Sequence, residues 1–404
     1  MNLLFPLTFF VALCPLVLWA MPLDLKQEPG VYRMKIQNTP SLRAKLIKEG
    51  KWKHFLEELH TNKASGSQPF IDYYDDFYLA NVTTGTPPQQ FTIAPDTGSS
   101  NYWIIDANKC KNQACQGYPG YASHNRFDST KSTTFKNLGT PFSIQYGSGS
   151  CDGTLAVDVL SFAGLSIPTQ TFGLASSIAD VFGYQPIDGI MGLGWPALAI
   201  DNVVPPMQNL LSQLNKPLFT VWLDRHVQIS QGGSGGVITY GDIDTTNCDA
   251  TINYVPLSSK RYWQFSIASF SVGTYSNKRQ AQVISDTGTS WIYGPTAAVD
   301  AIAQATNAIY DDDNGIYTVP CTATGLPDWV FNIGGINYNI PSSEYVLDLE
   351  LGDGNCALTL GDGSDLAVDG FQWILGDTFI RTYCNIYDIA GGRIGFAKAH
   401  HTGV

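Results

Sequence analysis

Short apolar runs separated by glycine, proline, asparagine and serine fill most of the chain. They are rich in aromatic and β-branched residues, as is typical of strands, and include Phe91–Ile93, Phe142–Gln145, Val237–Tyr240 and Trp263–Ile267. A helical period of apolar residues extends over only two longer stretches, Leu42–His60 and Pro295–Ile309. The pattern therefore predicts a mostly β protein.

The first 20 residues form a different kind of apolar segment. They carry no charged side chain, and a polar, charged stretch follows them directly. Because Pro6 and Pro15 disfavour a membrane-spanning helix, residues 1–20 are predicted to be a secretory signal peptide. The alternative is a membrane anchor. In a secreted chain, the sequon that begins at Asn81 predicts a glycan on that side chain.

Charge divides the chain into a basic front and an acidic body. Residues 21–70, called the front segment below, hold nine basic and five acidic side chains, a net charge of +4 within a chain of net charge −12. An acidic body disfavours nucleic acid and anionic membranes as partners. The two parts attract each other at neutral pH, and protonation of carboxylates in acid weakens that attraction. The alternative is that Leu42–His60 is a solvated amphipathic helix with its basic residues facing water.

Seven cysteines remain after removal of a signal peptide containing Cys14. Most should pair in an oxidising compartment, and an odd number leaves one thiol over. Cys110 and Cys115 are close enough to close a small loop, and Cys321 and Cys356 a longer one. Because the sequence contains no CxxC motif or Cys/His cluster, neither a metal site nor a cofactor is predicted.

A two-part signature occurs twice in the same order. Asp96–Ser100 and Asp286–Ser290 each read Asp-Thr-Gly, then Ser or Thr, then Ser, and each follows a strand-like run. A hydrophobic pair with glycine follows later in each half, at Ile190–Gly192 and Ile374–Gly376. A single Asp-Thr-Gly occurs in ordinary turns, whereas this repetition indicates two matching halves.

Two neighbouring carboxyls can hydrolyse an amide by activating water. The reaction needs a base that takes a proton from water and an acid that polarises the carbonyl. Because like charges held close together resist joint ionisation, a carboxyl pair keeps one shared proton and supplies both groups. The glycine lets the backbone turn beneath each carboxyl, and the hydroxyls can orient it. The signature therefore predicts that Asp96 and Asp286 activate water together.

These motifs resemble those of the pepsin and cathepsin D family of aspartic peptidases. The resemblance runs from about Val31 to the end and includes Gly85–Gln89, Tyr146–Ser150 and Asp188–Gly194. It implies two β lobes, residues 71–255 and 256–404, with a peptide-binding cleft between them. It also implies that the front segment is an inhibitory propeptide, with Lys63 a candidate to reach the aspartates and cleavage between about His60 and Tyr74.

The resemblance also implies roles for individual residues. Asp96 and Asp286 would be the catalytic pair, Thr97 and Thr287 would lock the two loops, and Ser99 and Thr289 would bond the outer carboxyl oxygens. Tyr146 would be the tyrosine of a flap over the substrate, supported by Trp103. The positions that contact the substrate backbone would be Gly98, Gly147, Ser148, Gly288 and Thr289. The implied disulfides are Cys110–Cys115, Cys321–Cys356 and Cys248–Cys384, which leaves Cys151 as the odd thiol.

The function expected from this resemblance is an acid endopeptidase made as a zymogen. Its partners would be protein and peptide substrates, with its own propeptide as inhibitor, and it would act as a monomer. It would enter the secretory pathway and reach an extracellular digestive lumen or a lysosome. The alternative is an inactive homologue that binds peptides or blocks another enzyme. Only Pro95 favours it, because proline before the first aspartate removes a backbone donor and predicts a local change in geometry.

Overall fold

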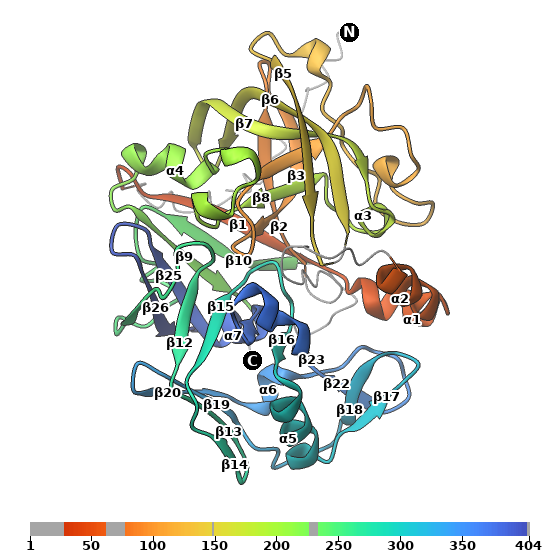
Figure 1. Ribbon diagram of the computed structural model, residues 1–404, viewed down its shortest axis with the longest axis vertical. Helices are drawn as coiled ribbons and strands as arrows, with labels where there is room; N and C mark the ends of the chain where they lie inside the picture. Colours follow the sequence, from red (N-terminus) through yellow and green to blue (C-terminus); the bar gives the residue numbers. More distant parts are fainter. Residues whose placement is uncertain (1–27, 62–76, 148, 226–232, 402–404) are drawn as a thin grey trace, which may run out of the picture.

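The structure, a computed structural model, describes residues 28–61, 77–147, 149–225 and 233–401 (Figure 1). The predicted signal peptide, Lys63, Ser148 and most of the expected cleavage region lie outside these ranges. Strands dominate the described chain, as the sequence pattern predicts. Figure 1 shows two groups of strands, with β1 crossing the middle of the molecule between them.

The largest sheet of the described residues has 13 strands and spans both halves of the chain. In spatial order these are β11 (Asn253–Pro256), β26 (Arg393–Lys398), β25 (Tyr383–Asp388), β9 (Leu218–Leu223), β10 (Gly233–Tyr240), β1 (Tyr32–Thr39), β2 (Phe77–Thr84), β3 (Gln89–Asp96), β8 (Gly189–Gly192), β4 (Tyr102–Ile105), β7 (Leu165–Ile178), β6 (Ser150–Phe162) and β5 (Lys136–Gln145). The C-terminal strands β25 and β26 thus pair with strands of the first half.

Three smaller sheets belong to the second half of the chain. One contains β12 (Gln264–Ile267), β15 (Ala281–Ser285), β24 (Trp373–Leu375), β16 (Ile292–Gly294) and β23 (Leu360–Asp362). Another contains β14 (Tyr275–Asn277), β13 (Ser269–Val272), β19 (Trp329–Ile333) and β20 (Ile336–Ile340). The last contains β17 (Ile309–Asp311), β18 (Ile316–Pro320), β22 (Asn355–Leu358) and β21 (Val346–Leu347).

Helices are short and lie between the strands. The α-helices are α1 (Leu42–Lys48), α2 (Trp52–Thr61), α3 (Asp180–Tyr184), α4 (Pro206–Leu210), α5 (Thr296–Thr306), α6 (Ser342–Tyr345) and α7 (Asp377–Thr382). Short 3-10 helices occupy Ala114–Gln116, Ser129–Lys131, Pro196–Leu198, Ile200–Asn202, Leu211–Gln213 and Ser364–Asp369. Within the described ranges, no helix is long and apolar enough to cross a membrane.

The same strand arrangement carries both aspartates. β3 runs parallel to β8, and β8 is antiparallel to β4. In the second half, β15 runs parallel to β24, and β24 is antiparallel to β16. Asp96 is the last residue of β3, and Asp286 directly follows β15. The hydrophobic pairs of the sequence signature lie on β8 and β24, beside the strands that carry the aspartates, and their side chains are buried.

The front segment contributes a strand and two helices. Met34 and Ile36 alternate with exposed charged residues along β1, which therefore buries one face while its backbone pairs with β10 and β2. Ser41 begins α1 by accepting a hydrogen bond from the backbone N–H of Ala44. The expectation of one helix over Leu42–His60 is wrong. α1 ends at Lys48, and Gly50, with φ of +66°, separates it from α2.

Candidate active site

Two threonines join the loops that carry the aspartates. The backbone N–H of Thr97 donates to Thr287 Oγ1 at 3.0 Å, and that of Thr287 donates to Thr97 Oγ1 at 2.9 Å. Each hydroxyl in turn donates to a carbonyl of the opposite half, Thr97 to Ser285 at 3.0 Å and Thr287 to Pro95 at 2.8 Å. These four reciprocal bonds fix the two loops against each other.

Each aspartate is held by the same pair of donors. Asp96 accepts hydrogen bonds from the Gly98 N–H, at 2.8 Å to Oδ1, and from the Ser99 hydroxyl to Oδ2. Asp286 accepts corresponding bonds from the Gly288 N–H at 2.9 Å and the Thr289 hydroxyl at 2.7 Å. Both carboxyls are fully buried. Their orientation is therefore set by local bonds before any substrate arrives.

Burial raises the pKa of both carboxyls, and the neighbouring Asp286 raises that of Asp96 further. For Asp96, desolvation raises the pKa most, the charge of Asp286 raises it further, and the bonds from Ser99 and Gly98 lower it in part. For Asp286, desolvation again raises the pKa against the bonds from Thr289 and Gly288. The bond between the two carboxyls raises the pKa of Asp96 and lowers that of Asp286. This arrangement favours one shared proton over two negative charges.

The predicted flap tyrosine lies at the tip of a hairpin. β5 and β6 form the hairpin, and the backbone N–H of Tyr146 donates to the carbonyl of Gly149 at 2.7 Å across its tip. The Tyr146 side chain is buried, and its hydroxyl accepts a hydrogen bond from Trp103 Nε1 at 2.9 Å. Gly147 is half-buried at the tip, and Ser148 lies outside the described residues. Trp103 thus holds the Tyr146 hydroxyl in place by a hydrogen bond.

Comparison with known proteins identifies the family of this paired site. Residues 77–399 match the profile of the eukaryotic aspartyl proteases. Aspartic protease 1 of Caenorhabditis elegans is 58% identical over 387 residues, which cover 93% of this chain and 96% of that protein. Pepsin A of Suncus murinus is 36% identical over 385 residues, covering 91% and 95% respectively. Embryonic pepsinogen of Gallus gallus is 35% identical over 393 residues, covering 92% and 96%.

The chain belongs to the eukaryotic aspartyl protease family. It is therefore an aspartic-type endopeptidase with the mostly β, two-lobed fold of that family.

Pro95 does not disturb the site of the protease, contrary to the local change predicted from the sequence. Its carbonyl accepts the Thr287 hydroxyl bond, just as that of Ser285 accepts the bond from Thr97. Its missing N–H removes no β2–β3 ladder bond, because the paired residues of that ladder end at Ile93. A proline at this position is compatible with the complete four-bond arrangement.

A polar cluster beneath Asp286 was not predicted from the sequence. Ser285 Oγ donates to Asn385 Oδ1 at 2.9 Å and lies 2.9 Å from the Tyr387 hydroxyl. All three side chains are buried. Asn385 and Tyr387 come from β25, a strand distant in sequence that no local motif links to the aspartates. Only the position of Ser285, equivalent to that of Pro95 in the duplicated signature, could have drawn attention to this cluster.

Two helices of the front segment pack against the rest of the protease. Lys45 Nζ donates to the Gly120 carbonyl at 2.6 Å and lies 3.8 Å from the ring centroid of Tyr121. The Tyr121 hydroxyl donates to Glu49 at 2.7 Å, and Trp52 Nε1 donates to the Asn314 carbonyl at 2.8 Å. These contacts join the front segment to both halves.

The alternative of a solvated helix with all its basic side chains in water is wrong for Arg43. The Arg43 side chain is buried, with 5% of the residue exposed, as are Leu42, Leu46 and Phe55. Lys53, by contrast, forms an ion pair with Asp313 in which both side chains remain largely exposed. The front segment therefore combines apolar burial, cation–aromatic contacts and surface ion pairing.

The three expected disulfides are present, as Cys110–Cys115, Cys248–Cys384 and Cys321–Cys356, and Cys151 is a buried free thiol. Potential ligand atoms of Cys321, Asp348 and Cys356 lie within 4.8 Å of one another. Because those two sulfurs are bonded to each other, this group is a disulfide and not a metal site. Asn81, the predicted glycan acceptor, is exposed on β2.

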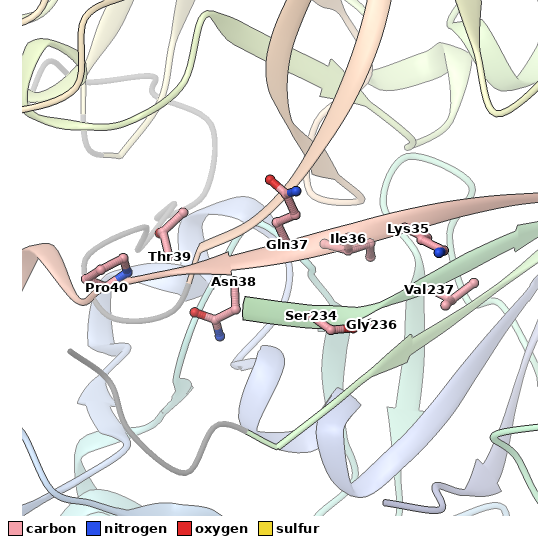
Figure 2. Close-up of a pocket in the computed structure, with 9 residues that line it drawn as sticks. All are labelled: Lys35, Ile36, Gln37, Asn38, Thr39, Pro40, Ser234, Gly236 and Val237. Carbon is pink, nitrogen blue, oxygen red and sulfur yellow. The ribbon is translucent and has the colours of Figure 1, made fainter. Parts of the chain in front are cut away.

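A cavity of about 660 Å³ lies away from the aspartates, along β1 and β10. Figure 2 shows its lining, with Gln37 and Asn38 on opposite sides of the β1 backbone and Ser234, Gly236 and Val237 on β10. The cavity contains none of the predicted site residues. Because β1 supplies one of its walls, it depends on the front segment being in place.

Proposed function

We propose that the protease is an acid-activated zymogen in which Asp96 and Asp286 together activate the hydrolytic water. The observation that carries this proposal is the pair of buried carboxyls, equivalently bonded and locked by Thr97 and Thr287. The raised pKa of both carboxyls supports a pair that keeps one proton in acid. The hydroxyls of Ser99 and Thr289 hold each carboxyl in an orientation suited to proton transfer.

The shared proton provides both halves of the reaction. The ionised carboxyl takes a proton from water, whose oxygen attacks the peptide carbonyl carbon, while the protonated carboxyl donates to the carbonyl oxygen. The resulting tetrahedral diol then passes a proton to the peptide nitrogen, the C–N bond breaks, and the acid and amine products leave. The pair ends with one proton, as it began. Activity is expected to fall as rising pH removes that proton.

The front segment is proposed to be the inhibitor of the site. β1 occupies the central sheet between β10 and β2, while α1 and α2 contact loops of both halves. Residues 71–255 and 256–404 are proposed to be the two lobes. The residues proposed to contact the substrate are Gly98, Gly147, Ser148, Gly288, Thr289 and the flap residue Tyr146.

The same proposal places the protease in the secretory pathway. Three disulfides are typical of an oxidising compartment, the sequon residue Asn81 is exposed, and residues 1–20 have the composition of a signal peptide. An extracellular digestive lumen or a lysosome would provide the acid that the mechanism needs. We propose protein and peptide substrates for a monomeric enzyme.

A time course of the purified precursor tests this proposal. The precursor is incubated at pH 3.5 and at pH 7 with a peptide substrate, with and without pepstatin. We expect the chain to shorten by about fifty residues in acid only, and pepstatin-sensitive cleavage of the peptide to appear at the same time. A precursor that stays inactive in acid, even after another protease removes the front segment, would instead support the inactive peptide-binding homologue.

A further inference from the structure

Arg43 of the front segment inserts its charge among aromatic rings. Its guanidinium carbon lies 3.9 Å from the centroid of the Trp291 ring and 4.9 Å from that of Trp52. Only 5% of Arg43 and 2% of Trp291 is exposed. A buried guanidinium is favourable only where its surroundings replace water, and the face of an indole ring attracts cations. The Trp291 face is thus a preformed surface that accepts a cation.

Trp291 belongs to the body of the protease and is buried in its second half. It packs in one cluster with buried residues of the second half, among them Tyr262, Ile284 and Ile374. The preceding residue, Ser290, accepts a backbone hydrogen bond from Thr378 of α7 at 3.2 Å. The ring should therefore keep its position when the front segment leaves.

The front segment covers this ring. Ala44 and Ile47 of α1 pack in the same cluster as Trp291, next to the contact that Arg43 makes. Removal of residues 21–70 takes away all three side chains together. The mature protease then presents an aromatic face where the precursor held an arginine.

The short chain between Trp291 and Asp286 limits how far the ring can lie from a substrate bound at the aspartates. Trp291 follows Asp286 by five residues, so their Cα atoms are at most about 18 Å apart. An extended peptide covers the same distance in about five residues. A substrate side chain within about five residues of the cut bond can therefore approach Trp291.

We propose that Trp291 forms a subsite that binds a lysine or arginine side chain of the substrate in the mature protease, replacing Arg43 of the precursor. This inference rests on the proposed function, because it assumes a substrate bound across the aspartates. Aromatic recognition suits an acid enzyme. Carboxylates lose their charge as pH falls, whereas lysine and arginine stay charged and the indole face does not titrate.

Peptides that differ by one charge test the subsite. Arginine or citrulline, which has nearly the same shape but no charge, is placed in turn at each of five positions on either side of one fixed bond. The mature protease is compared with Trp291→Leu, which removes the aromatic face, and Trp291→Phe, which keeps a weaker one. Tyr254→Leu is the matched control, because Tyr254 lies 4.0 Å from the guanidinium of Arg393 in a contact within the body.

The ratio of kcat/KM for the arginine and citrulline peptides is the measured quantity. We expect a ratio of about 5 to 30 at one position in the wild type and in Tyr254→Leu. This ratio should fall to about 1 in Trp291→Leu and to an intermediate value in Trp291→Phe. If the leucine variant does not fold, the phenylalanine variant still tests the subsite. A ratio near 1 at every position in the wild type, or one unchanged by both Trp291 substitutions, overturns the subsite. Cleavage of the citrulline peptides reports separately on the proposed function.

Discussion

Thr97 and Thr287 each donate a backbone N–H to the other's hydroxyl, at distances of 2.9 to 3.0 Å, across the two halves of the protease. Each hydroxyl also donates a bond of its own. That of Thr97 donates to the Ser285 carbonyl, and that of Thr287 donates to the Pro95 carbonyl. Since Asp96 and Asp286 directly precede the two threonines, this pair sets how close the carboxyls lie. The separation of the carboxyls is therefore a property of four hydrogen bonds between buried groups.

Replacement of either threonine by valine should weaken both stability and catalysis. Thr97→Val removes one hydroxyl but leaves the Thr287 N–H and the Ser285 carbonyl unpaired, at about 1–3 kcal/mol for each buried group. Thr97→Ser, which keeps the hydroxyl, is the control and should stay close to the wild type. Denaturant unfolding and kcat measure the two effects.

The double variant gives a sharper result. Because both threonines belong to one network of buried bonds, the loss of stability in Thr97→Val with Thr287→Val should differ from the sum of the single variants by about 0.5–3 kcal/mol. A strictly additive loss would show that the two residues act independently, contrary to the relationship described.

Gly98 has no room for a side chain. A methyl group there would lie 2.5 Å from Asp286 Oδ1, which is closer than real Cβ contacts allow. Gly98→Ala should therefore push the carboxyls apart and lower kcat by at least about tenfold, with a smaller effect on KM. Equal kcat for Gly98→Ala and the wild type would contradict this packing.

Local motifs contain the bonds around each aspartate because these contacts are repeated and short in range. Each aspartate is bonded by residues two and three positions later, Gly98 and Ser99 in the first half, so the sequence itself contains the geometry. The strands of the duplicated signature follow from their apolar runs. The disulfides were implied by the family resemblance, since spacing alone could not pair Cys248 with Cys384.

Contacts between distant segments could not be predicted in this way. The apolar period over Leu42–His60 continues across Gly50, so it gives no sign of the helix break that a positive φ produces. Nothing local links Ser285 to Tyr387, or Arg43 to Trp291, because the fold alone brings these pairs together. Arg43 on a basic amphipathic stretch looks like a surface residue until its aromatic partner is known.

Glu49 should make the release of the front segment sensitive to acid. The bond from Lys51, and next the one from the Tyr121 hydroxyl, lowers the pKa of Glu49 from 4.5. Lys51 belongs to the front segment, so only the bond from Tyr121 depends on docking. The lowering of the Glu49 pKa by that bond stabilises the docked state above the ordinary pKa of Glu49, and this contribution is lost as pH falls through the lowered value. Glu49→Gln should therefore activate about two- to fivefold faster at pH 5.5.

The difference should shrink as pH falls through the lowered pKa of Glu49, because the wild-type carboxyl then loses its charge as well. Asp313→Asn is the control, because it removes an ion pair with Lys53 whose side chains are mostly exposed, and it should change the rate less. The measurement is the rate of front-segment loss against pH. A Glu49→Gln precursor that activates more slowly than the wild type at pH 5.5 would reverse the predicted sign.

The most direct test of the central claim is peptide hydrolysis by Asp96→Asn and Asp286→Asn. Both precursors are trimmed by another protease, their folding is checked by circular dichroism, and kcat/KM is measured at pH 3.5. If the two carboxyls act as one unit, each variant should lose at least about 10³-fold of its activity, and the double variant little more. A folded single variant that keeps activity comparable to the wild type would contradict the shared-proton mechanism.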